Sequence, residues 1–229
     1  MEGESGDGKR PLLGELGPLL GGHHGLTRQQ IMDSQRERLL AAMAREVAAR
    51  SYRGITITEV VKLASVSTRD FYELFDSKEA CFLAAFDAVR DHLEELIRAA
   101  VADQPDWPHQ VIAALRAGLE FFAAEPDLAR LCLVEPVNAT PTIAIRFREA
   151  VLACVPALER GRGEADGASL PPSTEDSLLG GIISLATRSI LAGETEKLPA
   201  LLSDLVEFTL SPYLGAERAA ELAGNARAD

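Results

Sequence analysis

The chain has 229 residues, a hydrophobic fraction of 47% and a formal net charge of −12 at pH 7. This length and apolar content are enough to bury a core in one domain or in two small ones. No segment offers the roughly 18 uninterrupted apolar residues of a membrane-spanning helix, and Gly, Pro and Glu interrupt the first 25 residues, where a secretory signal would lie. We therefore expect a cytoplasmic protein with no membrane partner.

The apolar residues are mostly Ala and Leu, which favour helices, and runs that alternate Val, Ile and Thr are nearly absent. The composition therefore predicts an all-α fold. Cys81, Cys132 and Cys154 lie far apart in apolar helical contexts, which is typical of buried reduced thiols rather than of a redox or metal site. We expect neither a metal nor another cofactor.

Residues 1–30 are rich in Gly and show no helical period, so we interpret them as a flexible N-terminal arm. A helix is predicted to begin at Ser34, because Ser34 and Glu37 have the spacing of a capping box. Gly54 stands where a C-cap of this helix is expected. The apolar stripe between these ends consists of Leu40, Met43, Ala44 and Val47.

Two short helices are predicted next. Thr56 and Glu59 form a second capping-box pattern, and Ser67 marks another helix start shortly afterwards. Helices of about two turns are not stable alone, so these two must pack on their neighbours. Two helices joined by a turn of about three to four residues form a helix-turn-helix. A long helix is then predicted from Asp76 to about Val101.

The start of the second short helix carries polar side chains that suit nucleic acid. Thr68 and Arg69 stand at its first two positions and Tyr72 one turn later, on the side away from the apolar Phe71. The free amides of a helix N-terminus attract phosphate, and these side chains can donate to base edges and to the DNA backbone. Lys78 offers a second phosphate contact. The alternative is that all of them are ordinary solvated side chains.

The charges are distributed unevenly along the chain. Nine of the 23 basic residues but only seven of the 35 acidic residues lie between Arg28 and Lys78, so this stretch carries +2 and the remainder −14. A mildly basic end on an acidic body can bind a polyanion through one surface.

The second half of the chain predicts further helices over residues 104–126, 127–136 and 138–161, the last one interrupted or bent at Pro156. A flexible loop is expected over residues 161–172, followed by a helix capped by Ser173 and Asp176 and by a last helix over residues 196–214. Both final helices are apolar on more than one face, which indicates either a deep core position or a second subunit, and we favour a homodimer. The expected interface consists of Leu178, Ile182, Leu185, Ile190, Leu201, Leu205 and Phe208.

The segment VSTRDFYELFDSKEA, residues 66–80, resembles the signature of the TetR (tetracycline-repressor-like) family of transcriptional regulators. The matching residues are Val66, Ser67, Phe71, Tyr72, Phe75, Ser77, Lys78 and Glu79. The resemblance covers about residues 34–101 and extends over the rest only to the number and lengths of the helices. It implies a helix-turn-helix DNA-binding domain of three helices at residues 31–78, and a helical effector-binding and dimerisation domain at residues 79–229.

The resemblance also implies roles for individual residues. Thr56 and Thr58 would contact phosphates at the start of the second helix, and Lys78 would bind another phosphate. The residues that would face the major groove are Ser67, Thr68, Arg69 and Tyr72. Arg69 is the best candidate to contact a guanine.

Two features depart from the family pattern. Ser65 occupies a turn position where the family usually has Gly, so the turn must tolerate a side chain. Asp70 and Glu73 place acids on the recognition helix. Because acids repel phosphates, we expect DNA binding that depends strongly on salt and sequence.

By the same resemblance, a homodimer would bind a palindromic operator, act as a repressor, and be released by a small molecule that favours the non-binding state. The expected effector pocket consists of Phe86, Trp107, Phe121, Phe122, Leu131 and Phe147, with Glu135, Asn138 and Arg188 as polar anchors. Such a pocket favours a hydrophobic or amphipathic effector. Plain core packing is the alternative for its apolar members.

Two other classes of function have less support in the sequence. The sequence contains no Gly-rich phosphate loop, no metal-binding spacing and no nucleophile elbow, so an enzyme is not expected. A helical ligand sensor or scaffold that does not bind DNA stays open, because Asp70 and Glu73 lie on the recognition helix.

Overall fold

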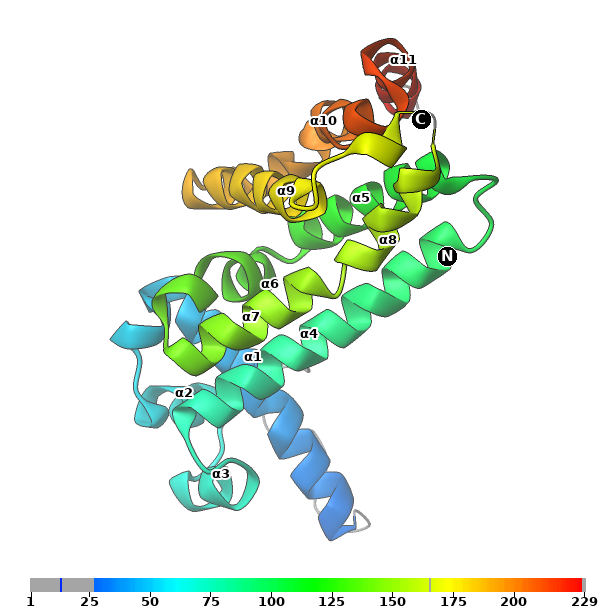
Figure 1. Cartoon of the computed structure of the whole chain (residues 1–229). Coiled ribbons are helices and arrows are strands. Elements are labelled where there is room, and N and C mark those ends of the chain that lie inside the picture. Colours follow the sequence, from blue (N-terminus) through cyan, green and yellow to red (C-terminus); the bar gives the residue numbers. More distant parts are fainter. Residues whose placement is uncertain (1–12, 14–26, 165, 228–229) are drawn as a thin grey trace, which may run out of the picture. The chain divides into compact units, whose positions relative to one another are not determined.

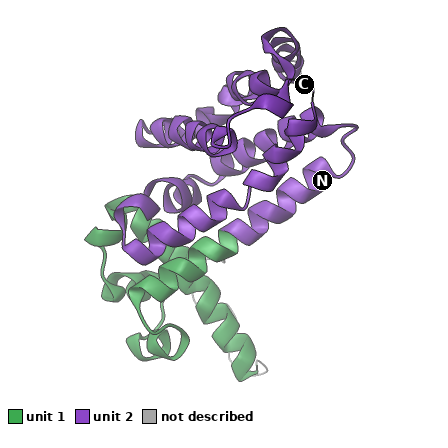
Figure 2. Ribbon diagram, in the orientation of Figure 1, with its two compact units in different colours: residues 1–89 green, residues 90–229 purple. Residues whose placement is uncertain are grey.

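The computed structural model describes residues 13, 27–164 and 166–227. Over these residues the chain forms helices and turns without a strand, which confirms the all-α prediction. It divides into two compact units, Met1–Val89 and Arg90–Asp229, shown in separate colours in Figure 2. Most of the predicted arm, residues 1–30, lies outside the described residues. No helix in the described ranges is long and apolar enough to cross a membrane.

The first unit begins with α1 (Arg28–Gly54), at the blue end of Figure 1. The Gln30 amide donates to the Thr27 hydroxyl at 3.2 Å, and the Thr27 amide donates to the Gln30 side chain at 2.8 Å. The predicted start at Ser34 is therefore wrong. An earlier capping box, Thr-x-x-Gln, extends the helix, so that Ser34 lies inside it.

The end of α1 contains a kink. Ser51 has a positive φ of 66° and interrupts the helical geometry, while Gly54 is the last helical residue and does not adopt a positive φ. The predicted end is thus in the right place, but the unusual backbone belongs to a serine rather than to the glycine.

The first short helix, α2 (Ile57–Ala64), has the predicted capping box. The Thr56 amide donates to the Glu59 carboxylate at 2.8 Å, and the Glu59 amide donates to the Thr56 hydroxyl at 3.4 Å. Ser65 ends the helix with φ 53° and ψ 43°, in the left-handed region that favours glycine. The turn does tolerate a side chain there.

The second short helix, α3 (Thr68–Leu74), is capped by Ser67, whose hydroxyl accepts the amide of the residue three positions later at 3.0 Å. The next helix, α4 (Lys78–Val101), ends as predicted but begins later than Asp76. Ser77 caps it in the same manner, at 3.0 Å. Both short helices therefore form where the sequence indicated them.

The core of the first unit draws on all four helices. Its fully buried side chains include Leu39, Met43, Val47, Val60, Phe71 and Phe82. Tyr52 packs edge-on against Phe82, with ring centroids 5.3 Å apart. The two short helices pack on α1 and on each other, and this burial supplies the stability that two-turn helices lack in isolation.

The cysteines only partly follow the prediction. Cys81 and Cys132 are buried, and burial raises the pKa of both thiols, that of Cys81 to about 12. Both are therefore protonated thiols at neutral pH. Cys154 is exposed, so the expectation of burial is wrong for this residue.

The second unit starts within α4 and continues through seven further helices. They are α5 (Trp107–Ala124), α6 (Pro126–Ala129), α7 (Pro141–Leu152), α8 (Val155–Glu159), α9 (Thr174–Leu191), α10 (Leu202–Leu214) and α11 (Ala216–Ala226). Short π- and 3-10-helical turns join them: η1 (Arg130–Val134), η2 (Pro136–Asn138), η3 (Arg160–Gly163), η4 (Gly167–Ser169) and η5 (Thr195–Leu201). The helix break near Pro156 was predicted, whereas α11 was not. Ser173 precedes α9 but makes no side-chain cap.

Residues 161–172 form ordered turns in their described part rather than the predicted flexible loop. Arg162 holds them, because its guanidinium donates to the carbonyl oxygens of Leu170 and Pro171 at 3.0 and 2.9 Å. The same guanidinium makes two hydrogen bonds, at 2.9 and 2.6 Å, to the carboxylate of Glu175, which also accepts from Tyr213 at 3.0 Å. Glu175 is only 1% exposed, so this network anchors the segment to the interior.

Candidate DNA-binding surface

The outer face of α3 carries the side chains that the sequence singled out for base contact. Ser67, Thr68 and Arg69 are exposed, and the ring of Tyr72 is 55% exposed. The opposite face is anchored by Phe71, which is fully buried. Four of the predicted residues are thus exposed on α3 and at its N-cap.

Thr56 and Thr58 are also exposed, at the start of α2. The Thr56 hydroxyl donates to the Glu59 carboxylate at 2.9 Å and accepts that residue's amide, so it is engaged in the helix cap. Thr58 has no such engagement among the described residues. The phosphate contacts assigned to both threonines stay predictions.

Lys78 lies in a different setting from the one expected. Its ammonium donates to the carbonyl oxygens of Tyr52 and Ile55, both at 2.9 Å, and lies 4.3 Å from the centre of the Tyr52 ring. Burial lowers the pKa of Lys78. Two of its three N–H groups therefore join the end of α1 to the start of α4, and one is left for the predicted phosphate contact.

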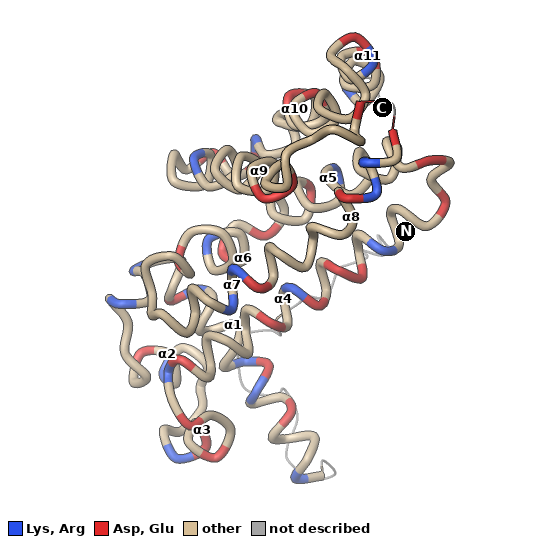
Figure 3. Tube along the Cα trace, in the orientation of Figure 1, with Lys and Arg blue, Asp and Glu red and all other residues tan. Residues whose placement is uncertain are grey.

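The two acids on α3 have partners within the first unit. The Asp70 carboxylate accepts a hydrogen bond from the side-chain amide of Gln35 at 3.3 Å. The Glu73 carboxylate accepts from Arg69 Nε at 3.3 Å and lies 3.8 Å from a terminal nitrogen of Arg28. Figure 3 shows basic and acidic positions close together on α3.

Sequence reasoning missed Arg28 and Gln35 as part of this surface. Both belong to α1, and their separation of seven residues places them on one face of a helix, two turns apart. That signal was present, but it required the helix to start at Arg28. The assumed start at Ser34 left Arg28 in the arm.

The residues predicted to line an effector pocket differ in exposure and in their contacts. Trp107, Phe121, Phe122 and Leu131 are buried, Phe147 is half-buried, and Asn138 and Arg188 are exposed. The Trp107 indole donates to the Ala157 carbonyl at 2.8 Å and packs edge-on against Tyr213, which is a structural role. Glu135 is 4% exposed and lies 3.5 Å from Arg130. Phe86 belongs to the first unit.

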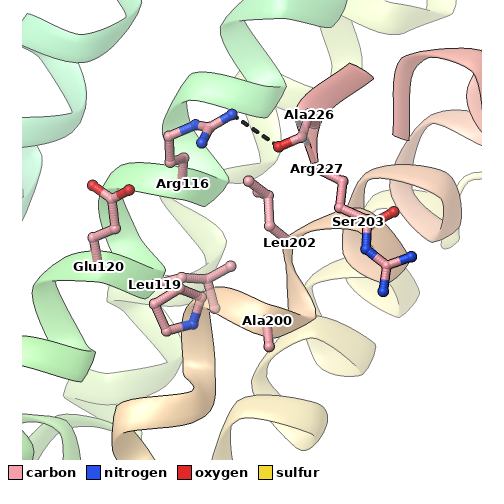
Figure 4. A pocket seen from close by; sticks show the side chains of 9 residues that line it. Arg116, Leu119, Glu120, Ala200, Leu202, Ser203, Ala226 and Arg227 are labelled. Atoms are coloured by element: carbon pink, nitrogen blue, oxygen red, sulfur yellow. Dashed lines mark hydrogen bonds between the residues drawn. The ribbon is translucent and has the colours of Figure 1, made fainter. Parts of the chain in front are cut away.

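Two hollows in the second unit have other linings. One of about 250 Å³, shown in Figure 4, lies between α5, η5, α10 and α11, where Arg116 donates to the Ala226 carbonyl at 3.0 Å. The other, of about 480 Å³, is open and lies beside Phe208 and Pro212. None of the residues predicted for the pocket lines either hollow.

The residues predicted for a dimer interface differ in exposure. Leu205 is fully buried, and Leu178 and Ile190 are 4% and 5% exposed, so the unit's own helices cover them and their assignment to an interface is corrected to the core. Ile182, Leu185 and Leu201 are half-buried. Phe208 is 43% exposed, and Leu191, which was not predicted, is 59% exposed.

A family of known proteins matches the segment that contains the exposed side chains of α3. The sequence model described as "Bacterial regulatory proteins, tetR family" matches residues 39–85. The uncharacterized HTH-type transcriptional regulator YdgC of Bacillus subtilis is 30% identical over 100 residues, which are 42% of this chain and 51% of YdgC. The HTH-type transcriptional activator FasR of Mycolicibacterium smegmatis is 27% identical over 126 residues, which are 55% of this chain and 58% of FasR. The matched regions thus span little more than half of these relatives.

Solved structures share the fold over most of the chain. The fatty acid degradation regulator FadR of Bacillus halodurans superposes with a TM-score of 0.67 at 16% identity, covering 77% of this chain and 93% of FadR. FadR of Bacillus subtilis in complex with stearoyl-CoA superposes with a TM-score of 0.65 at 14% identity, covering 76% of this chain and 97% of that FadR chain. At such identities the likeness concerns the fold alone. Residues 39–85 thus match the sequence model of the bacterial regulatory proteins of the tetR family, and the chain shares its fold with the two FadR regulators.

Proposed function

We propose that this protein is a cytoplasmic transcriptional regulator that binds a palindromic DNA operator as a homodimer, represses, and is released by a small hydrophobic effector. The observation that carries the proposal is the exposed cluster of Thr68, Arg69 and Tyr72 on α3, above a fully buried Phe71. A hydroxyl, a guanidinium and a phenol at the start of a rigid helix can donate to base edges and to phosphates. Residues 31–78 would form the DNA-binding domain and residues 79–229 the effector-binding and dimerisation domain.

DNA binding is tested by selecting bound fragments from a library of random duplexes. We expect enrichment of a palindrome whose half-sites lie about one helical turn or more apart. Arg69→Ala should weaken the selected site by about 1–3 kcal/mol and relax the preference at one base. Recovery of unenriched DNA would instead favour the alternative of a helical sensor or scaffold, for which the acids on α3 are the supporting feature.

The homodimer is supported by the exposed apolar residues of α9 and α10. The Phe208 ring lies over α9 at Gly181, where a Cβ atom would be 2.7 Å from the ring, so the absence of a side chain at Gly181 leaves room for the ring. Phe208 and Leu191 keep 43% and 59% of their surface exposed. Large exposed apolar side chains of this kind often mark an interface. Sedimentation at micromolar concentration measures the oligomeric state directly, and a stable monomer would exclude the homodimer.

The effector is proposed from the shared fold and from the apolar character of the second unit. The FadR structure of Bacillus subtilis contains stearoyl-CoA, which makes a long-chain acyl-CoA the first probe for this protein. We expect such a molecule to lower the affinity for the selected operator by favouring a non-binding state. The name of FasR specifies an activator, so a promoter fusion is needed to measure whether transcription falls, as we propose, or rises.

A further inference from the structure

We propose that Glu73 is a specificity-determining residue of the DNA-binding surface. It orients Arg69 for a base contact and keeps Arg69 and Arg28 from binding phosphates on non-cognate DNA. This inference deepens the proposed DNA-binding function and rests on it.

The Glu73 carboxylate lies between guanidinium groups from two helices. Arg69 Nε, on α3, donates to Oε1 at 3.3 Å, and Arg28 Nη2, in the first turn of α1, lies 3.8 Å from Oε2. The side chains of Arg69 and Arg28 are 87% and 85% exposed, and that of Glu73 is 40% exposed. The positions of Arg69 and Glu73 share the outer face of α3 with Thr68 and Tyr72. The three charges therefore form one network on the surface proposed to meet DNA.

Support of the fold does not explain this network. Exposed ion pairs add little to stability, because water screens the charges and ordering two long side chains costs entropy. The helix is already held by the buried ring of Phe71 and by the Ser67 cap. An acid that is dispensable for folding still has a large effect on a polyanion, since it would face phosphates.

The geometry of the pair suits base recognition. Glu73 accepts from Nε of Arg69, which leaves both terminal nitrogens of that guanidinium without a partner among the described residues. Those two nitrogens are the donors that contact O6 and N7 of guanine together. A side chain held at Nε also loses less rotamer freedom on binding. Glu73 thus prepares Arg69 for a guanine contact without occupying the donors that make it.

The same carboxylate opposes binding to other sequences. Arg28 and Arg69 are balanced by Glu73 and the neighbouring Asp70, so the surface carries no net charge from these four residues. Non-specific affinity comes from neutralised phosphates, each of which contributes about −0.9 to the salt slope. A surface without net charge therefore adds little to the non-specific affinity. A repulsive group that penalises the wrong partner raises specificity without raising affinity.

The test compares wild type with Glu73→Ala and Glu73→Gln on three duplexes: the selected operator, that operator with the base read by Arg69 replaced, and a scrambled sequence. Glu73→Ala should bind the scrambled duplex about three- to tenfold tighter, with a salt slope steeper by about one to two phosphate contacts. It should also lose most of the discrimination against the replaced base. Glu73→Gln keeps an acceptor for Nε without the charge, so it should bind the scrambled duplex more tightly but retain discrimination.

A second background separates orientation from general charge. In Arg69→Ala, the further change Glu73→Ala should leave base preference unaltered while still raising affinity for scrambled DNA. Glu120→Gln removes an exposed acid from α5, in the other unit, and should change neither quantity. An equal gain in Glu120→Gln would overturn the assignment to Glu73.

The outcomes for the two proposals are distinct. If wild type enriches no sequence, the proposed DNA-binding function fails and the role of Glu73 falls with it. If wild type enriches a sequence but Glu73→Ala discriminates as well as before, or the scrambled duplex gains no affinity, only the role of Glu73 is refuted. Arg69→Ala identifies the base concerned, and an unchanged preference at every position in that variant would also refute it.

Discussion

Replacing Lys78 by alanine should destabilise the first unit as well as weaken DNA binding. The ammonium donates to the carbonyl oxygens of Tyr52 and Ile55 at 2.9 Å each and lies 4.3 Å from the Tyr52 ring centre. A hydrogen bond to a charged group contributes about 1.5–3 kcal/mol, and a cation–π contact about 0.5–1 kcal/mol. Because the site is only partly buried, water can replace part of these interactions in the variant. We therefore expect the free energy of unfolding to fall by about 2 kcal/mol.

The assay is denaturant unfolding followed by circular dichroism, combined with hydrogen exchange of the amides around residues 52–56. Exchange there should accelerate in Lys78→Ala, because the end of α1 loses its link to α4. Lys62→Ala is the matched control. Lys62 is exposed on α2, and its side chain makes no hydrogen bond or ion pair among the described residues, so its removal should change the unfolding free energy by less than about 0.5 kcal/mol.

DNA affinity measured at a temperature where both variants are folded completes the comparison. Equal weakening on all sequences, with a flatter salt dependence, would support the phosphate contact of the remaining N–H group. If the unfolding free energy and the exchange rates stay unchanged while affinity falls, the two carbonyl contacts contribute nothing and the reasoning from the structure is refuted.

Three further predictions concern the second unit. Gly161→Ala would place a Cβ atom 2.3 Å from the indole of Trp107. It should lower the free energy of unfolding by about 1–3 kcal/mol and change the tryptophan fluorescence. In the control Gly163→Ala, in the same turn, the added Cβ atom meets nothing within 4 Å, so this variant should be nearly as stable as wild type. Phe208→Glu should convert the proposed dimer to a monomer in sedimentation, and Val137→Glu, at a residue that is 61% exposed, should not. Burial raises and the paired arginine lowers the pKa of Glu175, with a net value below the ordinary 4.5. The ionised Glu175 carboxylate therefore stabilises the folded protein at pH values above its ordinary pKa, and this stabilisation is lost as the pH falls through the lower native pKa. On acidification, wild type should lose stability more steeply than Glu175→Gln. Parallel pH profiles would contradict this.

The short helices of the first unit were predictable because their signals are local. Thr56 with Glu59, and Ser67 with Asp70, lie three residues apart, and in each case a side chain caps an amide within the same turn. The exposed face of α3 follows from the same local pattern, since a buried Phe71 fixes which side chains point outward. Local rules therefore located most of the candidate DNA-binding surface.

Contacts between distant residues were not predictable in this way. Arg162 and Glu175 are 13 residues apart, and Glu175 and Tyr213 are 38 apart, so no window of sequence shows that they meet. The consequence was a flexible loop predicted where three side chains fix the backbone. Arg28 and Glu73 are a similar case, because their contact depends on how α1 and α3 pack.

The missed helix α11 explains why the dimer interface was predicted too broadly. Its buried residues are Ala219, Leu222, Ala223 and Ala226, which have i, i+3, i+4, i+7 spacing, but three of them are alanines and the stripe is inconspicuous. The helix packs against α10, where the Ser203 hydroxyl donates to the Ala223 carbonyl at 3.1 Å. Without α11, the two apolar faces of α10 indicated a second subunit. With α11 present, Leu205 is fully buried within one chain, and Phe208 is the large apolar side chain of α10 that stays exposed.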